Sequence, residues 1–311
     1  MKNQLAPFII VSVCALALGP LCAEFFGPEW RAKWMLALAA NQFQNEQLDD
    51  AEKTLQNAAQ LSADLTTDPE FWILKLEIDL SNKNLSQDFH PVYEEVKSQI
   101  AKSPTANQAN LAYFVGGLFH QRHQNELAVE ILEKFFPPIS QRTASENNSI
   151  SYFRSKTKKG LETALREIDA ALVTDGNMLP EFLDTKAWVL HGLNRNELAL
   201  TFIQQAIKNE NAAIGKLKGM NDKDRIELQT RLFTAPSAQE ASTSTAKNRI
   251  EDLTKHFPEY SPKLLDALVR GVASLRFHRA CILDELGLTE ESELDYAWLD
   301  SFGFQETDKL N

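Results

Sequence analysis

The chain has little cysteine, glycine or proline: its 311 residues include three Cys, 12 Gly and 12 Pro. Cys14 and Cys22 fall in an apolar N-terminal stretch, so Cys281 alone remains and the body has no internal disulfide. Long alternating runs of Val, Ile and Thr, which are typical of strands, are also missing. Ala, Leu, Glu, Gln and Lys dominate instead, and these residues favour helices. The composition therefore predicts an all-α protein.

The short motifs of common catalytic sites are absent as well. There is no G-x-S-x-G, no phosphate-binding glycine loop, no G-x-G-x-x-G and no paired C-x-x-C. His120 and His123 could share a helix face, but a metal site needs a third ligand, so we expect them to be structural. Cys281 follows Arg-Ala in an apolar helical context and is expected to be a small buried hydrophobe. We expect no catalytic residue, no cofactor and no bound metal.

The charge is acidic and unevenly distributed. The formal net charge is −11, which argues against nonspecific nucleic-acid binding. Between Arg279 and Lys309 there is no basic residue, while the segment contains these acids: Asp284, Glu285, Glu290, Glu291, Glu293, Asp295, Asp300, Glu306 and Asp308. Two interpretations stay open: a solvated cap for the end of the fold, or a docking surface for a basic partner.

One four-position pattern recurs along the chain. A small residue is followed by a second small residue twelve positions later, then by a large residue four further on and an apolar one three beyond that. Helices that cross closely need small residues where their backbones meet, and the last two steps keep one helix face apolar. The pattern predicts repeated helix–turn–helix hairpins. The four copies are Ala39, Ala51, Leu55 and Ala58; Gly116, Ala128, Leu132 and Phe135; Ala187, Ala199, Ile203 and Ala206; Ala280, Ser292, Tyr296 and Leu299.

At these positions the chain resembles the tetratricopeptide repeat (TPR) family, whose period is about 34 residues. The two best copies are residues 109–140 and 180–211, where Gly116 and Phe119 match the family's glycine and tyrosine positions. Their turns, both Asn-Glu-Leu-Ala, begin at Asn125 and Asn196, and we expect each Asn to cap its helix. No copy has the full signature. The resemblance implies antiparallel helix pairs stacked as a right-handed solenoid that starts near Trp30.

The pattern divides the chain into repeats and interruptions. Residues 140–157 are polar and predict an interruption between repeats; Asn147-Asn148-Ser149 within them matches the glycosylation triplet. In the C-terminal hairpin, helical phase predicts packing for Leu283, Leu286, Leu294, Tyr296, Trp298 and Leu299, with the acids mostly projecting outward. The expected segments are a signal or anchor (1–23), N-terminal repeats (30–140), central repeats (158–233), a flexible polar linker (234–248), a C-terminal hairpin with an acidic face (249–303) and a tail (304–311).

The N-terminus carries an uncharged apolar stretch over residues 5–23, with Lys2 before it and Glu24 after it. This arrangement is typical of a cleaved secretory signal peptide, and its length would also suit a transmembrane anchor. Both interpretations stay open. In either case the positive charge precedes the apolar stretch, so the body is expected to lie outside the cytoplasm.

The function that these observations favour is a non-catalytic scaffold for protein–protein interaction on the extracytoplasmic side of a membrane. Its partner would be a protein or peptide, with a basic one favoured by the acidic C-terminal hairpin; a membrane would be contacted only through an uncleaved N-terminal segment. The alternative is an exported all-helical enzyme, for example a polysaccharide-acting one, with a carboxylate site between repeats. The two differ in whether Asp184, Glu181 and Glu197 face a common groove.

Overall fold

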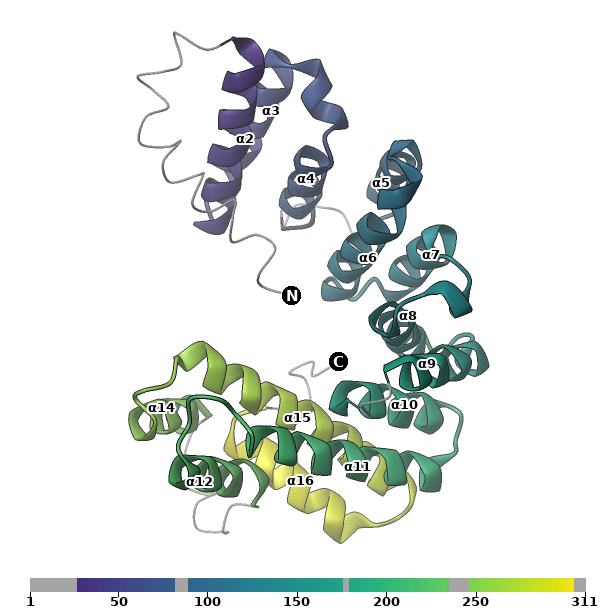
Figure 1. The fold of residues 1–311 in the computed structure, drawn as a ribbon, viewed down its shortest axis with the longest axis vertical. Coiled ribbons are helices and arrows are strands. Elements are labelled where there is room, and N and C mark those ends of the chain that lie inside the picture. Colours follow the sequence, from purple (N-terminus) through teal and green to yellow (C-terminus); the bar gives the residue numbers. More distant parts are fainter. Residues whose placement is uncertain (1–26, 82–88, 176–178, 235–245, 305–311) are drawn as a thin grey trace. The chain divides into compact units, whose positions relative to one another are not determined.

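The computed structural model describes residues 27–81, 89–175, 179–234 and 246–304, and every regular element in these ranges is a helix (Figure 1). The all-α prediction is therefore confirmed for this part of the chain. The predicted signal or anchor, most of the predicted linker and nearly all of the predicted tail lie outside the described residues. Among the helices within the described ranges, none combines the length and the apolar character that crossing a bilayer requires.

The chain divides into two compact units, residues 1–136 and 137–311. The helices of the first unit are α2 (Pro28–Gln44), α3 (Leu48–Leu61), η1 (Ala63–Thr67), α4 (Pro69–Ser81), α5 (His90–Lys102), α6 (Thr105–Gln121) and α7 (Asn125–Phe135). Those of the second are η2 (Ile139–Gln141), α8 (Ala144–Thr157), α9 (Leu161–Asp175), α10 (Pro180–Gly192), α11 (Asn196–Ile214), α12 (Asp222–Phe233), α14 (Ala246–His256), α15 (Pro262–Glu285) and α16 (Thr289–Ser301).

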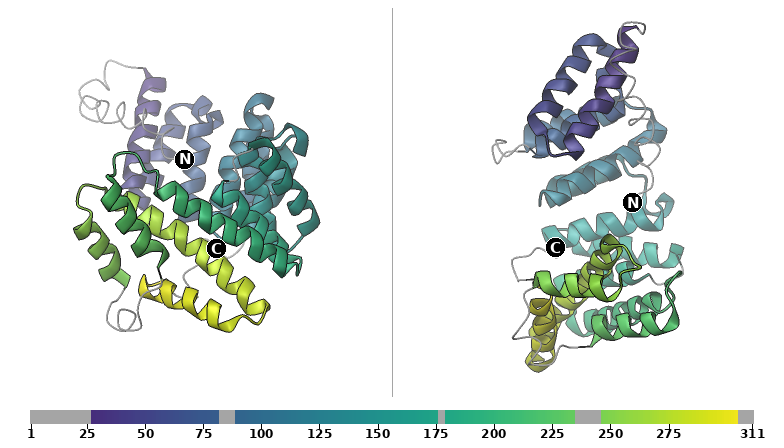
Figure 2. Two further views of the ribbon diagram at one scale, coloured as in Figure 1. Left: turned by 60° about the horizontal axis from the view of Figure 1, so that its bottom comes forward. Right: turned by 90° about the vertical axis from the view of Figure 1, so that its left-hand side faces the viewer.

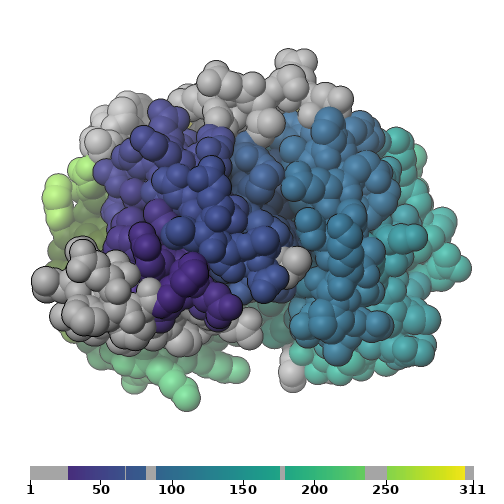
Figure 3. All heavy atoms as spheres, turned by 90° about the horizontal axis from the view of Figure 1, so that it is seen from above, coloured from purple at the N-terminus to yellow at the C-terminus, as the bar shows by residue number. Residues whose placement is uncertain are grey.

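The first unit consists of two extensive helix pairs, α2 with α3 and α6 with α7, and of α4 and α5 between them. Helix α4 contacts α2, α3, η1 and α5, so its side chains are covered on several sides. Figure 3 looks onto the part of this unit that carries α2 to α5. The many neighbours of α4 explain why Phe71, Trp72, Leu74, Leu76, Ile78 and Leu80 are all buried.

The second unit contains three helix pairs: α8 with α9, α10 with α11, and α15 with α16. The 24-residue helix α15 runs beside α11 and also packs against α10, α12 and α14 (Figures 1 and 2). Its apolar residues join Trp298, Leu299 and Phe302 of the last helix pair in one core, together with Leu228 and Leu232 of α12. Helix α15 therefore joins α10, α11, α12, α14 and α16.

The four hairpins that carry the small-residue pattern share one turn geometry. A residue with positive φ stands seven positions after the first small residue: Glu46, His123, Asn194 and Gly287, with φ of 61°, 60°, 58° and 72°. The N–H of the next residue then donates to the carbonyl five positions back, at 2.9 Å in every hairpin. This left-handed termination satisfies the last carbonyls of the first helix and directs the chain into the second. The repeat is thus visible in the backbone as well as in the side chains.

The small residues lie where the paired helices meet. Ala39, Ala51, Ala187, Ala199 and Ala280 are fully buried. At Gly116 a Cβ atom would lie 3.1 Å from the Leu132 side chain and 3.5 Å from the Ala128 carbonyl, so the two backbones approach closely there. The prediction that these residues form the helix–helix contacts is confirmed.

Several local predictions are wrong. Residues 140–157 do not interrupt the fold, because a capping box at Thr143 and Glu146 starts α8, which pairs with α9. Asn147, the acceptor residue of the glycosylation triplet, is buried and donates to the Ile139 carbonyl at 3.1 Å, so its side chain is not presented to solvent. The last residues of the predicted linker, 246–248, belong to α14. Phe304, the first residue of the predicted tail, packs into the core.

Candidate binding groove

The first unit has a groove of about 310 Å³ along α3, α4 and α5. Phe71, Trp72 and Ile78 of α4 are buried and form its apolar floor. Polar side chains surround them, and they come from all three helices: Glu52 and Gln56 of α3, Lys75 and Asp79 of α4, Glu95 and Gln99 of α5. The volume lies at the lower end of the range seen for ligand pockets in proteins, about 300–1,000 Å³.

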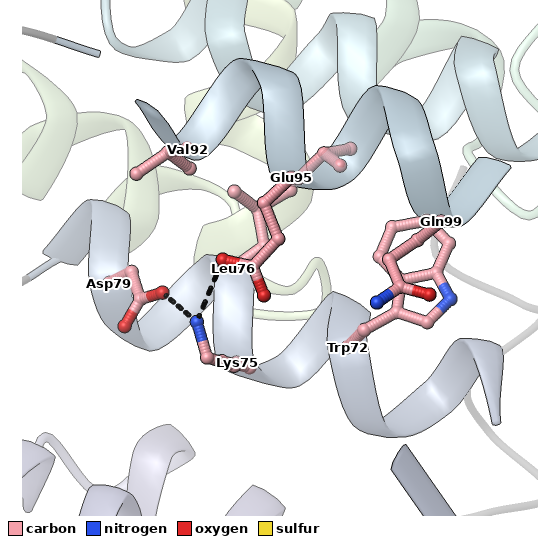
Figure 4. Close-up of a pocket in the computed structure, with 8 residues that line it drawn as sticks. Trp72, Lys75, Leu76, Asp79, Val92, Glu95 and Gln99 are labelled. Carbon is pink, nitrogen blue, oxygen red and sulfur yellow. Dashed lines mark hydrogen bonds and ion pairs between the residues drawn. The ribbon is translucent and has the colours of Figure 1, made fainter. Parts of the chain in front are cut away.

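Lys75 is the basic residue among the groove's lining side chains, and it is shared by two carboxylates (Figure 4). Its Nζ atom lies 2.8 Å from Asp79 Oδ2, one turn further along α4, and 3.4 Å from Glu95 Oε2 of α5. Burial lowers the pKa of Lys75, but the two carboxylates outweigh it and the pKa rises above its ordinary value. Lys75 therefore stays protonated and joins α4 to α5.

The same part of α4 holds a further titratable group, Glu77. Burial raises the pKa of Glu77 above its ordinary value, because the carboxylate loses part of its hydration. The alternation of apolar and polar residues along α4 thus places acids on two sides of the helix: Asp79 toward the groove and Glu77 in a partly buried position.

The second unit holds a buried aspartate–histidine pair between α10 and α15. His278 Nδ1 lies 2.7 Å from Asp184 Oδ1, and the imidazole stacks on Trp188 at 4.2 Å between ring centroids. The opposite ring nitrogen, Nε2, is buried and has no hydrogen-bond partner among the residues that the structure describes. Burial lowers the pKa of His278 more than the Asp184 carboxylate raises it, so the ring is neutral at pH 7. An enclosed Nε2 atom has no access to a substrate, which favours a structural role.

Lys156 of α8 completes this cluster. Its ammonium group lies 4.7 Å from the centroid of the Trp188 ring and 4.8 Å from that of Tyr152, as cation–π contacts do. Burial lowers its pKa to about 8, although Asp184 and Cys281 both act in the opposite direction. Burial likewise raises the pKa of Tyr152, and Asp184 adds to that effect. The second unit therefore contains an amine that is partly deprotonated under mildly alkaline conditions.

Two further clusters each place one buried carboxylate between two arginines. Glu167 of α9 accepts from Arg142 Nη1 at 2.8 Å and from Arg154 Nε at 2.9 Å. Asp295 of α16, which is fully buried, accepts from Arg276 at 2.7 Å and from Arg279 at 2.6 Å. Arg276 also donates to the Phe233 carbonyl at 2.7 Å, which ties the end of α12 to this site.

Most of the residues singled out in the sequence have structural roles. His120 Nδ1 lies 2.6 Å from Asn125 Oδ1, and His191 Nδ1 lies 2.8 Å from Asn196 Oδ1, so both hairpins close with the same contact. The expected N-cap role of the two Asn residues is wrong, because each is the first helical residue and its side chain bonds to histidine instead. His123 forms the turn with positive φ.

The acids named as an enzyme signature do not converge. Asp184 is bonded to His278, whereas Glu181 and Glu197 are exposed. Cys281 is half-buried rather than buried. Within the described ranges, no three His, Cys, Asp or Glu side chains are grouped as metal ligands would be.

The sequence prediction missed both arginine clusters, although a signal for them exists. Glu167 stands three residues after the small Ala164, and Asp295 three residues after the small Ser292, so each acid shares the inner face of its helix. Leu294, predicted to pack, is instead 56% exposed. The acids Asp284, Glu290, Glu291, Glu293 and Asp300 do point outward as expected.

The comparisons with known proteins leave the family open. No protein-family model matches the chain, and no curated protein sequence matches it. The helical hairpins and the groove are therefore the observations on which a function has to be based.

Proposed function

We propose that the protein is a non-catalytic TPR-like scaffold that binds a protein or peptide partner. The groove along α3, α4 and α5 carries this proposal, because it combines an apolar floor with polar groups from three helices. Interfaces that bind peptides need this combination: buried apolar contacts for affinity and a polar rim for orientation.

The repeated hairpins support the same proposal. Four helix pairs share one turn geometry and one set of small contact residues, as the units of a stacked repeat array do. Such arrays form right-handed solenoids in the TPR family, and we extend that architecture to this chain. Repeat proteins offer extended surfaces to partners and rarely build a catalytic centre, which favours a scaffold over an enzyme.

The enzyme alternative has less support. A polysaccharide-acting site needs two carboxylates facing one substrate-sized space. Asp184 is occupied by His278, while Glu181 and Glu197 are exposed on α10 and α11. The proposed location, outside the cytoplasm and either secreted or anchored, rests on residues 1–23, which lie outside the described part of the chain.

Photo-crosslinking in the host tests the proposal. A photoreactive amino acid is placed in the full-length chain at Gln56, in the groove, and at two exposed positions of the second unit, Leu198 and Ile226. We expect a discrete adduct with one protein at one or more positions, and saturable binding of that protein by calorimetry after purification. The absence of a protein adduct at all three positions would contradict a scaffold function.

A further inference from the structure

We propose that the groove along α3, α4 and α5 holds a basic peptide segment, whose Lys or Arg side chain is bound by Glu95 and Glu52 above the apolar floor. This inference rests on the proposed scaffold function and narrows it to one site and one class of partner. Three observations support it: the charge balance of the groove, the incomplete pairing of Glu95, and the side chains around Trp72.

The charge of the groove favours a cation. Three carboxylates line it (Glu52, Asp79 and Glu95) against the one ammonium of Lys75, which leaves an excess of two negative charges. An acidic peptide or a nucleic-acid phosphate would be repelled at this site, and a neutral segment would leave the excess uncompensated. A segment that carries Lys or Arg complements it.

Glu95 is the carboxylate with capacity for a new partner. Lys75 makes its shorter contact, 2.8 Å, with Asp79 of its own helix, whereas the contact to Glu95 is 3.4 Å and Glu95 is half exposed. Charge-assisted hydrogen bonds are optimal near 2.7–2.9 Å. An incoming cation can therefore bind Glu95 while Lys75 stays with Asp79. Glu52 is also accessible, since its contact at 3.1 Å is to the neutral amide of Gln56.

The floor and the amides indicate a peptide rather than a free cation. Phe71, Trp72 and Ile78 offer apolar surface below the carboxylates. Gln99 of α5, which Figure 4 draws with Trp72, and Gln56 of α3 add two amides to the lining of the groove. Amide groups pair well with the N–H and C=O groups of a peptide backbone. In a peptide with an apolar residue next to a Lys or Arg, the apolar side chain would pack on the floor while the cationic side chain reached Glu95.

The test measures binding of three short fluorescent peptides to the full-length chain by anisotropy. The peptides share their apolar residues and differ in the flanking positions, which are all Lys, all Gln or all Glu. We expect the Lys peptide to bind most tightly and to weaken as salt rises, because exposed charges are screened beyond about 8 Å at physiological ionic strength. Glu95→Gln and Glu52→Gln should each weaken it about threefold, the scale of one exposed ion pair.

A variant that is expected to increase the affinity distinguishes a lost contact from a loss of folding. Lys75→Gln removes the competing ammonium, so it should strengthen binding of the Lys peptide by about threefold. Partial unfolding would weaken binding in every variant and cannot produce this gain. The matched control is Glu293→Gln, which removes the same charge from an exposed position of α16 and should leave the affinity unchanged.

The outcomes separate the groove from the scaffold function. Equal loss in Glu293→Gln and Glu95→Gln, or no gain in Lys75→Gln, would overturn the groove assignment, while a crosslinked partner would still support the scaffold. If Glu95→Gln alters the sedimentation of the chain and leaves peptide affinity unchanged, a second copy occupies the groove and the basic-peptide proposal is wrong. If no peptide binds and crosslinking yields no adduct, both proposals fail.

Discussion

In the first unit the buried side chains that the structure describes are apolar or aromatic, whereas the second unit buries Arg154, Glu167, Arg276, His278 and Asp295. Apolar contacts are non-directional and tolerate small shifts between helices. A buried carboxylate held between two arginines fixes the geometry of its helices, and it is costly when one member is missing. The second unit therefore adds buried ion pairs to the apolar packing that both units share.

The difference also concerns where charge remains available. In the first unit, Lys75, Asp79 and Glu95 meet at the rim of a groove, partly in contact with solvent. In the second unit, the carboxylates of Glu167 and Asp295 are paired with arginines of the same chain. A partner can compete for the first set and not for the second. The proposed binding site therefore uses the first set of charges.

The largest expected effect is at Asp295. Asp295→Asn keeps the shape of the side chain but leaves Arg276 and Arg279 without their carboxylate, and a broken buried pair costs about 3–5 kcal/mol. We expect the free energy of unfolding, measured with urea, to fall by that amount. Asp300→Asn removes an exposed charge from the same helix and should change stability by less than about 0.5 kcal/mol.

The first unit supplies the comparison for that result. Asp79→Asn breaks a partly exposed ion pair, so its cost should stay within about 1 kcal/mol. Similar losses in Asp79→Asn and Asp295→Asn would show that the two units do not differ as their interiors indicate.

The second largest effect is expected at the helix contacts. Ala187 is fully buried between α10 and α11. Ala187→Leu inserts three carbons into this contact and should cost about 1–3 kcal/mol through overpacking. The control is Val173→Leu on α9, which enlarges a side chain that is 84% exposed and should leave stability nearly unchanged. Unchanged stability in Ala187→Leu would contradict the close backbone approach on which the repeat is based.

The helix pairs were predictable because close crossing has a strict steric requirement. Ala39, Gly116, Ala187 and Ala280 are each followed by a second small residue twelve positions later, and each is buried. The conformation of the turns was not predictable from side-chain type. Four residues with different side chains have the same positive φ: Glu46, His123, Asn194 and Gly287. Helix α8 was missed because its inner face is polar, with Asn147, Ser151 and Arg154 buried where apolar residues were sought.

The candidate groove could not be predicted from the sequence. Glu52, Lys75 and Glu95 come from three helices, and nothing in their spacing links them. Glu94-Glu95 looks like any solvated pair of acids, and α4 has a strand-like alternation of apolar and polar residues from Leu74 to Leu80. Its Leu, Lys and Glu residues favour a helix, and packing on several sides buries the apolar ones.

Lys156 of the second unit and Lys75 of the first should contribute to the pH dependence of stability with opposite signs. The pKa of Lys156 is lowered to about 8 in the native state, so between about pH 8 and 10.5 the unfolded chain binds more protons and stability rises with pH. The pKa of Lys75 is raised, so its contribution is complete at neutral pH and is lost at high pH.

Methionine variants measure these two contributions. The stability of the wild type relative to Lys156→Met should increase from pH 7 to pH 10. The stability relative to Lys75→Met should stay nearly constant over this range and decrease only above about pH 10.5. Urea unfolding at a series of pH values gives both differences. A pH-independent difference for Lys156→Met would show that its ammonium group is well hydrated in the native protein.

The smallest effects are expected at the exposed acids of α16. Glu290 and Glu291 lie in its first turn, where a negative charge interacts favourably with the helix dipole. Glu291→Gln should therefore cost about 0.3–1 kcal/mol at low salt, and less at high salt because the interaction is screened. Glu293 lies beyond that turn, and Glu293→Gln should change stability by less than about 0.5 kcal/mol. A loss in either variant that approached the Asp295→Asn value would mean that these acids are structural partners, and the contrast between buried and exposed carboxylates in this helix would not hold.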